Sequence, residues 1–376
     1  MKLSGKKSVF IIILLLSGMI TACTGAHKGE SEAINSESAD KVVTTTDVWQ
    51  GQHSSLGNSY DIAMISGDTI YGCYEKDGNA VISYQDKQNK VLEKEITLTE
   101  MDYIQNMYAD ISGNVYILGL DKEGSKLGVV NNQGEFSKLG DLVLDNTENA
   151  DFITPRGIYA DNKGNYYIWY RMAVPMAEAG INDDAYVMLD RIYVKDAQFQ
   201  TIFYEQVLDY KGSILHSFYL DAAGTPYMIA EDDKGMYVCE LDVEQKKKLE
   251  AVYINQSMGE SGEIEAVFGT EGGLLYCQDG ALHYFLNDTK ELKWKIKLES
   301  CGLYAQDILY CGVRGENIEV INNFGTGSNT EYTILKNEEN EKILVSLGTM
   351  YPSQSLEKVV TEFNHYSEDT VVEIIS

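Results

Sequence analysis

The most constraining feature of this chain is a short phrase that recurs along it, in which Asp is followed by Gly after three residues and by Tyr after six. Three clear copies and one degraded copy occupy residues 110–116, 161–167, 221–227 and 270–276. The copies begin 51, 60 and 49 residues apart. Repeats of this period with strand-like content are typical of a β-propeller, in which each repeat forms one four-stranded blade. The repeat therefore predicts an all-β propeller of about six blades, with seven as the alternative.

The residue types within the phrase support this prediction. Asp at the start of a turn accepts hydrogen bonds from nearby backbone N–H groups, and Gly supplies the positive φ that reverses the chain. The residues that follow, such as 115–120 and 166–170, are apolar on both faces. Inner strands packed between neighbouring blades are expected to have this pattern. The phrase also resembles turns of several bacterial propeller families, including those with NHL-like and YVTN-like arrangements.

Further units are weaker. One starts near Ile65, with a turn and strand at 67–71, and another starts near Gln306, with residues 307–310 in the corresponding place. The longest interval between copies contains residues 173–184, whose small and acidic side chains predict a loop insertion.

Calcium binding is an alternative role for the Asp residues of the repeat. A calcium site needs roughly six to eight oxygen ligands, and the chain has no D-x-D-x-D loop with a following Glu. One Asp per turn therefore favours turn formation. The sequence predicts no metal site and no cofactor.

Five cysteines besides Cys23 are spread along the chain without a C-x-x-C pair, at Cys73, Cys239, Cys277, Cys301 and Cys311. The first three lie inside apolar, strand-like runs, where a buried free thiol acts as a small hydrophobic group. A disulfide between Cys301 and Cys311 is the alternative that the sequence leaves open.

The N-terminal 23 residues combine three lysines, an apolar run at 9–16 and the sequence Ile-Thr-Ala-Cys at 20–23. The apolar run is short for a membrane-spanning helix, which needs about 20 residues. The segment resembles the signal peptide and lipobox of bacterial lipoproteins. This resemblance implies that residues 1–22 are removed and that Cys23 is lipidated, holding the protein on the extracytoplasmic face of the cell membrane. An uncleaved anchor helix is the alternative.

Composition bounds the segments that follow. Residues 23–47 are rich in Ser, Thr, Glu and Ala and lack aromatic side chains, which predicts a disordered tether. The propeller is then expected over residues 48–340. The net charge of −28 excludes nucleic acid as a partner, because the protein and the phosphate backbone repel each other.

The pattern changes in residues 341–376. An apolar strand at 342–347 is followed by Leu356, Val359, Val360 and Phe363, which share one helix face, and then by a second strand at 371–375. Ser353 is predicted to cap the helix and Asn364 with His365 to end it. A strand, a helix and a strand in this order predict a βαβ unit with parallel strands.

Residues 342–348, 356–364 and 371–374 resemble the opening of the extracellular solute-binding proteins of ABC importers, especially the sugar-binding type. The resemblance implies that the segment is the incomplete start of a solute-binding α/β domain and that the chain is truncated. It also implies an importer permease as partner and Tyr351 as a residue that stacks on a sugar ring. An exposed turn residue is the alternative role for Tyr351.

Motifs for catalysis are absent from the sequence. The five histidines lack H-x-x-x-H and H-E-x-x-H spacing, and there is no G-x-S-x-G elbow. The sequence predicts that the chain is not an enzyme. It favours a cell-surface lipoprotein whose non-catalytic propeller binds a small molecule or glycan. The propeller is expected to be joined to a solute-binding component of an ABC importer for carbohydrate. The alternatives are a propeller glycan hydrolase or lyase and a protein–protein interaction module.

Overall fold

The computed structural model of this protein describes residues 48–110, 112–122, 124–140, 150, 152–175, 186–209, 214–221, 223–254, 264–270, 272–324, 329–338, 343–349, 353–367 and 370–375. The chain forms two compact units. The larger unit comprises residues 51–298 and 303–336, and the smaller comprises residues 1–50, 299–302 and 337–376. Cys23 and Tyr351 lie outside the described residues, as do the predicted signal peptide 1–22 and the tether 23–47.

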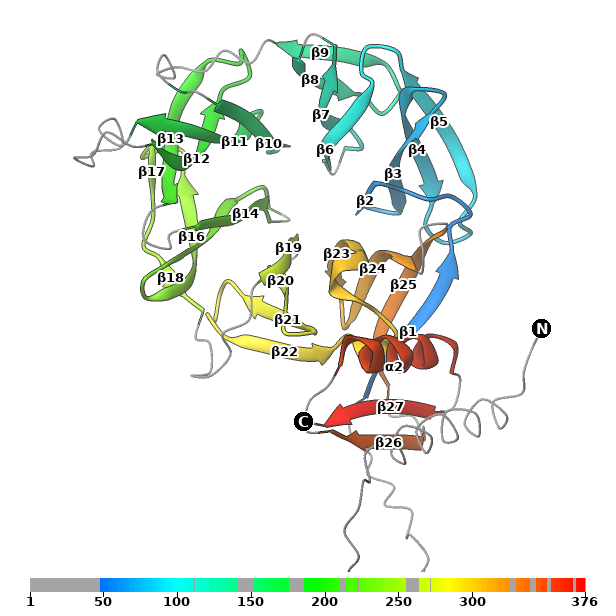
Figure 1. The fold of residues 1–376 in the computed structure, drawn as a ribbon. Coiled ribbons are helices and arrows are strands. Elements are labelled where there is room, and N and C mark those ends of the chain that lie inside the picture. The colour runs from blue at the N-terminus through cyan, green and yellow to red at the C-terminus, as the bar shows by residue number, and fades with distance from the viewer. Residues whose placement is uncertain are drawn as a thin grey trace, which may run out of the picture. The chain divides into compact units, whose positions relative to one another are not determined.

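The described strands of the larger unit form six antiparallel sheets, which are the blades of a propeller (Figure 1). Blades 1 to 3 contain, in order from the innermost strand, β2 (Ile62–Ser66), β3 (Thr69–Lys76), β4 (Asn79–Asp86) and β5 (Leu92–Leu98); β6 (Tyr103–Ala109), β7 (Val115–Asp121), β8 (Gly124–Val130) and β9 (Phe136–Gly140); and β10 (Phe152–Ala160), β11 (Tyr166–Pro175), β12 (Tyr186–Lys195) and β13 (Thr201–Asp209).

Blades 4 to 6 continue the ring. They contain β14 (Ile214–Leu220), β15 (Pro226–Asp232), β16 (Gly235–Asp242), β17 (Lys247–Lys248) and β18 (Val252–Tyr253); β19 (Ile264–Thr270), β20 (Gly273–Gln278), β21 (Ala281–Leu286) and β22 (Leu292–Lys297); and β23 (Ile308–Arg314), β24 (Asn317–Phe324), β25 (Asn329–Glu338) and β1 (Val48–Ser55). Six blades are confirmed over the described residues, so the alternative of seven is wrong.

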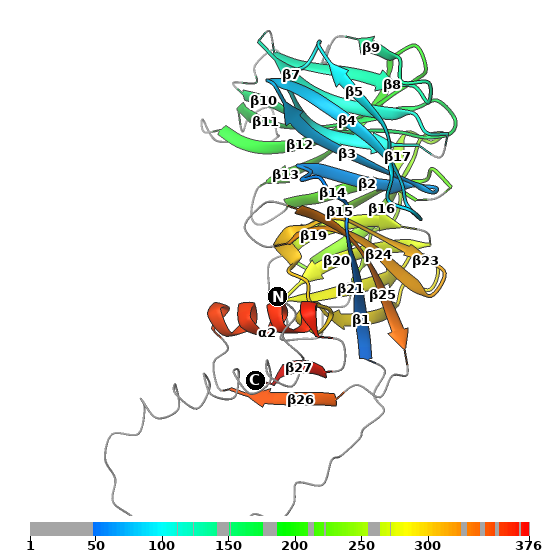
Figure 2. The ribbon, with the colours of Figure 1, turned by 90° about the vertical axis from the view of Figure 1, so that its right-hand side faces the viewer.

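Blade 6 is built from both ends of the propeller sequence. The strand β1 pairs with β25 and forms the outer edge of a sheet whose other strands come from the far end of the unit (Figure 2). Directly after β1, the Leu56 N–H donates to the Thr330 carbonyl at 2.9 Å, and the Thr330 N–H donates to the Asn58 carbonyl at 2.9 Å. The Thr330 hydroxyl also accepts from the Tyr60 N–H at 2.8 Å. These bonds close the ring.

Charged side chains join blade 1 to blade 6 at the same seam. The Lys87 side chain is only 6% exposed, and its ammonium group lies 3.1 Å from the Glu319 carboxylate. Glu319 also accepts a hydrogen bond from the Tyr332 hydroxyl at 2.8 Å. Nearer the surface, Arg314 contacts Asp68 at 3.2 Å. The buried lysine therefore has its countercharge supplied by the neighbouring blade, as a buried charge requires.

The Asp residues of the repeat form turns, as predicted. Asp161 Oδ1 accepts from the backbone N–H groups of Lys163 and Asn165, and Oδ2 accepts from the Asn165 amide and the Tyr167 hydroxyl, at 2.8 to 2.9 Å. Asp110 makes the equivalent four bonds. Asp221 accepts two backbone N–H bonds. In two copies the Tyr of the phrase is thus a hydrogen-bond donor that closes the turn.

The degraded fourth copy has a different turn. Thr270 pairs directly with Gly273, which leaves a two-residue hairpin connection. The side chain of Thr270 instead accepts from the Val313 N–H at 2.6 Å. The same short connection joins β2 to β3, where Ser66 pairs with Thr69. The weaker unit near Gln306 is placed differently from the prediction. Residues 308–310 were expected to follow the first turn of a blade, but they begin β23, the innermost strand of blade 6, which precedes that turn.

Two other local predictions need correction. The insertion expected at 173–184 begins later, because Ala173 and Pro175 are still paired with β12; residues 176–185 lie outside the described part. The disulfide alternative is wrong, since Cys301 and Cys311 are both free and buried.

The remaining described cysteines are also free and buried. Burial raises the pKa of the Cys73 thiol to about 12 and that of the Cys239 thiol to about 11. These thiols stay protonated at neutral pH, so they serve as packing groups, as the sequence predicted.

The smaller unit contains a βαβ arrangement. Strands β26 (Ile343–Gly348) and β27 (Thr370–Ile375) pair in parallel, and helix α2 (Gln354–Tyr366) connects them. Two short 3₁₀ turns, η1 (Glu299–Cys301) and η2 (Ala305–Asp307), lie between β22 and β23 in the sequence, and η1 belongs to this smaller unit. No helix among the described residues is long and apolar enough to cross a membrane.

The helix α2 differs in detail from its prediction. Ser353 caps it by accepting from the Leu356 N–H at 3.2 Å, as expected. Val359, however, is 47% exposed, whereas Val360 is buried. The helix ends at Tyr366, so the predicted end at Asn364 and His365 falls in its last turn. The Asn364 amide bonds both the N–H and the carbonyl of Val372 in β27 at 2.8 Å. Asn364 is therefore buried, and its amide satisfies the backbone hydrogen-bonding groups of Val372. The spacing of apolar residues in the sequence does not predict this buried polar position.

The repeat turns generate a stability prediction. Asp161→Ala removes four hydrogen bonds and should lower the free energy of unfolding by about 2 to 3 kcal/mol. Asp221→Ala removes two described bonds and should lower it by about 1 kcal/mol. Urea denaturation followed by circular dichroism measures both. Equal losses in the two variants would contradict the role of the Tyr167 hydroxyl and the Asn165 amide in the first turn.

Candidate functional site

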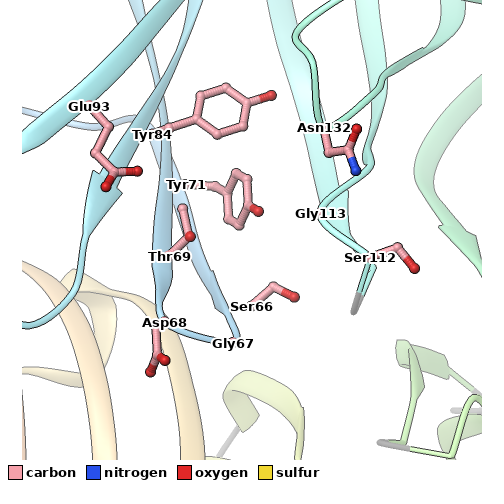
Figure 3. A pocket seen from close by; sticks show the side chains of 10 residues that line it. All are labelled: Ser66, Gly67, Asp68, Thr69, Tyr71, Tyr84, Glu93, Ser112, Gly113 and Asn132. Atoms are coloured by element: carbon pink, nitrogen blue, oxygen red, sulfur yellow. The ribbon is translucent and has the colours of Figure 1, made fainter.

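An open groove lies between blades 1 and 2 of the larger unit (Figure 3). Its volume is about 390 Å³, within the usual range for small-molecule sites. The residues that line it are Ser66, Gly67, Asp68, Thr69, Tyr71, Tyr84, Glu93, Ser112, Gly113 and Asn132. They come from the β2–β3 turn and strands β3 to β5 of blade 1, and from the β6–β7 and β8–β9 turns of blade 2.

The two first turns of these blades are tied together. The Ser66 hydroxyl donates to the Asp110 carbonyl at 2.7 Å, across the junction between the blades. Gly113 has a φ of +81°, which the Asp110 turn requires and which few other residues adopt. A Cβ at Gly113 would lie 3.3 Å from the Tyr71 hydroxyl oxygen. The glycine thus lets the turn approach the tyrosine closely at the groove wall.

Tyr71 and Tyr84 form the aromatic part of the groove. They are directly opposed on β3 and β4, with ring centroids 5.1 Å apart and an interplanar angle of 68°, an edge-to-face arrangement. Figure 3 shows both hydroxyl groups directed toward the turns of blade 2. Burial raises the pKa of Tyr71 and raises that of Tyr84 well above its usual range. Both phenols are therefore neutral O–H donors at any physiological pH.

The Tyr84 hydroxyl has no hydrogen-bond partner among the described residues, although the side chain is only 8% exposed. An unpaired buried hydroxyl costs roughly 1 to 3 kcal/mol. The Lys94 ammonium group lies 5.7 Å from the Tyr84 ring centroid and donates instead to the Gln133 carbonyl of blade 2. The wall of the groove therefore contains a buried hydroxyl whose hydrogen-bonding capacity the fold leaves unsatisfied.

Two carboxylates line the groove, those of Asp68 and Glu93, and none of the ten lining residues is Lys or Arg. The Asp68 carboxylate is paired with Arg314, as described above, so Glu93 contributes the carboxylate without an ion-pair partner among the lining residues. Ser112 and Asn132 add an exposed hydroxyl and an amide on the blade 2 side. Aromatic rings, neutral hydroxyls, an amide and carboxylate acceptors suit a ligand with many hydroxyl groups and disfavour an anionic one.

Both site residues predicted from the sequence, Cys23 and Tyr351, lie outside the described residues, so their roles stay predictions. The sequence pointed to Ser66, Asp68 and Tyr71 only as parts of a weak repeat unit. Nothing in the local sequence marks Tyr84 or Asn132, because they become neighbours only when two blades pack together.

The unpaired hydroxyl can be tested without a ligand. Tyr84→Phe should leave the free energy of unfolding unchanged or raise it slightly, because no internal hydrogen bond is lost. The matched control is Tyr167→Phe, which removes a 2.8 Å bond to Asp161 and should lower the free energy of unfolding by about 1 to 2 kcal/mol. Thermal and urea unfolding compare them. A loss in Tyr84→Phe as large as in the control would show that this hydroxyl has a partner in the folded protein.

No family model and no curated protein matches this chain. Among solved structures, a luciferin-regenerating enzyme is similar over 76% of this chain and 95% of its own, with 9% identity and a TM-score of 0.47. A protein of unknown function from Bacteroides caccae is similar over 68% of this chain and 83% of its own, with 11% identity and a TM-score of 0.39.

The prediction that this chain is not an enzyme is contradicted by the first of these matches, because a structure similar to it is named as an enzyme. That prediction is withdrawn. At such identities and TM-scores the matches carry no argument about a reaction, a substrate or a catalytic residue, and the family of the chain is not established by them.

Proposed function

We propose that this protein is a lipid-anchored solute-capture protein of the extracytoplasmic face, whose propeller binds carbohydrate in the groove between blades 1 and 2. The observation that carries this proposal is the Tyr84 hydroxyl, which is buried and unpaired among the described residues in the wall of the groove, beside Tyr71. A hydroxyl-rich ligand that displaces the wall around this hydroxyl would supply the missing hydrogen bond.

The chemistry of the groove wall favours carbohydrate over other solutes. Sugars carry hydroxyl groups that both donate and accept, which matches the phenol of Tyr84, the amide of Asn132 and the carboxylates of Asp68 and Glu93. Their C–H faces are apolar enough to pack on aromatic rings. Phosphorylated or carboxylated ligands would meet the Glu93 carboxylate and the net charge of −28, and no lining residue is Lys or Arg.

The anchor and the transport role rest on other parts of the chain. The lysine-rich start and Cys23 support lipidation, and the resemblance of residues 342–374 to solute-binding proteins supports a role with an ABC importer. The parallel strands β26 and β27 with α2 between them are compatible with the start of such an α/β domain. The propeller would hold sugar near the membrane surface, where an importer permease takes up its substrate.

Sugar binding is the first test of the proposal. A full-length Cys23→Ser protein should bind one or more of maltose, cellobiose and chitobiose in isothermal titration calorimetry. Tyr84→Phe should weaken that binding by about tenfold, since one hydrogen bond made only in the complex is lost.

The matched control for binding is Tyr332→Phe, which removes a hydroxyl that bonds Glu319 outside the groove and should leave affinity unchanged. Chromatography of the same mixtures would detect any sugar product, which would assign an enzyme activity to the propeller. Failure of all three sugars to bind at millimolar concentration would refute carbohydrate capture at this groove.

Lipidation is tested separately. In a bacterial host, the wild-type protein should yield an N-terminal peptide that begins at a lipid-modified Cys23 in mass spectrometry. Cys23→Ser should carry no lipid and should retain residues 1–22. Recovery of residues 1–22 from the wild-type protein would instead identify an uncleaved anchor helix.

A further inference from the structure

The innermost strands of the propeller share a β-bulge at one position. In blades 2 to 6, one residue of the innermost strand is left without a partner on the second strand, where the pairing register shifts. These inserted residues are, in blade order, Gln105, Arg156, His216, Glu265 and Leu309. Each lies five positions before the turn that follows its strand, and those turns begin at Asp110, Asp161, Asp221, Thr270 and Arg314.

Blade 1 has an equivalent position at Asp61. Its first turn begins at Ser66, and counting back five residues from there gives Asp61. The Asp61 N–H donates to the Cys73 carbonyl at 2.8 Å, although Ile62 is the residue that pairs with Cys73. Two successive residues that oppose a single residue form a bulge. The six inserted residues, Asp61, Gln105, Arg156, His216, Glu265 and Leu309, are called the bulge ring below.

The bulge ring surrounds the axis of the propeller. The innermost strands form the inner margin of the blades, and one edge of each is free of pairing (Figure 1). Around the ring, β2 comes within 8 Å of β6 and of β23 between Cα atoms, as β6 does of β10, and as β19 does of β14 and of β23. In a regular hexagon, the distance from a corner to the centre equals the distance between neighbouring corners. Long side chains at these positions can therefore reach the axis.

Solvent reaches the bulge ring. Asp61, Arg156 and Glu265 are exposed, and the other three members are half-buried. Arg156 is exposed although both of its neighbours in the strand, Pro155 and Gly157, are buried. A bulge takes a side chain out of the alternating pattern of the strand and aims it elsewhere, and bulges are frequent beside binding sites.

Arg156 differs from the other arginines of this acidic chain. Arg171 and Arg314 contact carboxylates at 2.8 and 3.2 Å, and Arg191 lies over the Tyr204 ring at 4.7 Å. Arg156 makes no hydrogen bond or ion pair with the residues that the structure describes, although the chain has 58 acidic residues. A guanidinium group binds carboxylates in a two-pronged geometry, so Arg156 is available to an anionic group of a ligand.

The remaining members of the bulge ring divide by chemistry. N–H donors occupy three consecutive blades, because Gln105 and His216 flank Arg156. The His216 imidazole is held by the Glu231 carboxylate at 3.0 Å. The two carboxylates of the ring, Glu265 and Asp61, belong to the other side.

Leu309 of blade 6 lies between these two carboxylates in the order of the blades. The blade opposite it in a ring of six is blade 3, which carries Arg156. The bulge ring thus opposes a guanidinium group to two carboxylates that flank an apolar side chain.

We propose that the bulge ring binds a small zwitterion that has separate ammonium and carboxylate groups, either an amino acid or a short peptide. The carboxylate is bound by Arg156 with the donors of Gln105 and His216 beside it, and the ammonium group is bound by Glu265 and Asp61. Leu309 contacts the aliphatic part of the ligand. This site is distinct from the groove between blades 1 and 2, so it does not rest on carbohydrate binding there.

The charges of the bulge ring also determine what it rejects. A dianion such as phosphate would be repelled by Asp61 and Glu265, and a diamine would be repelled by Arg156. A zwitterion alone satisfies both sides.

The experiment uses full-length Cys23→Ser protein and titration calorimetry with alanine, dialanine and trialanine, whose charged ends lie progressively further apart. At least one of them should bind. The N-acetylated form of that ligand lacks the ammonium group, and its C-terminal amide lacks the carboxylate. Each should bind at least tenfold more weakly than the unmodified ligand.

Two variants assign the charged ends to residues. Arg156→Gln should lower affinity for the unmodified ligand by tenfold or more and abolish the preference over the C-terminal amide. Glu265→Gln should lower affinity likewise and reduce the preference over the N-acetylated form. Lys293→Gln is the matched control, because it removes an exposed positive charge from β22, the outermost strand of blade 5, and should bind as the parent does.

Each result decides the inference. Absence of binding by all three ligands at millimolar concentration would overturn it, as would equally tight binding of the two modified forms to the parent. Unchanged affinity in Arg156→Gln would also overturn it. Arg156 is exposed, so this variant should keep the parent's circular dichroism spectrum; if it does not, the modified ligands decide on the unaltered bulge ring. None of these outcomes bears on sugar binding, which the titrations with maltose, cellobiose and chitobiose test separately.

Discussion

The pairing of β1 with β25 is the interaction on which the rest of the propeller depends. Each blade buries its faces against two neighbours, so a ring that fails to close leaves two blades with an uncovered apolar face and a sheet edge. Thr330 stands at the centre of the closure, since its backbone bonds both Leu56 and Asn58 and its hydroxyl accepts from Tyr60. The Lys87–Glu319 pair adds a buried charged contact between the first and last blades.

Closure of the ring also holds blades 1 and 2 in place and so maintains the groove between them. The junctions between blades 2 and 3 and between blades 3 and 4 are packed ring against ring, as between Tyr108 and Tyr159 at 5.6 Å and between Tyr159 and Phe218 at 5.0 Å. The junction of blades 1 and 2 is held by the Ser66–Asp110 bond and by Lys94, so it can omit rings and stay in place. A local loss of packing is tolerated there because the neighbouring blades are fixed by the closed ring.

Local chemistry explains how much of this fold could be predicted from sequence. The Asp turns, the six-blade repeat and the βαβ order depend on residues close in the chain, and each was predictable. Closure by β1 was not, because it joins segments separated by nearly the whole propeller. The repeat extends beyond its Asp-Gly-Tyr phrase, because Tyr108, Tyr159 and Tyr219 stand two residues before each Asp. Tyr108 and Tyr159 pack ring to ring between the innermost strands of blades 2 and 3. The sequence around Tyr84 does not mark it as a site residue. Its hydroxyl is unpaired because the neighbouring blade provides no hydrogen-bond partner for it among the described residues, and this becomes evident only in the folded structure.

The closing strand also has a mechanical consequence. Because β1 is the part of blade 6 nearest to the N-terminal residues, tension on the preceding chain reaches the propeller first through the hydrogen bonds between β1 and β25. That load is shared along the strand and passes into Thr330 and the core of the last blade. A pull on the N-terminal residues would therefore act on the same seam that completes the ring, and the force needed to detach β1 would set how much load the propeller can bear from that side.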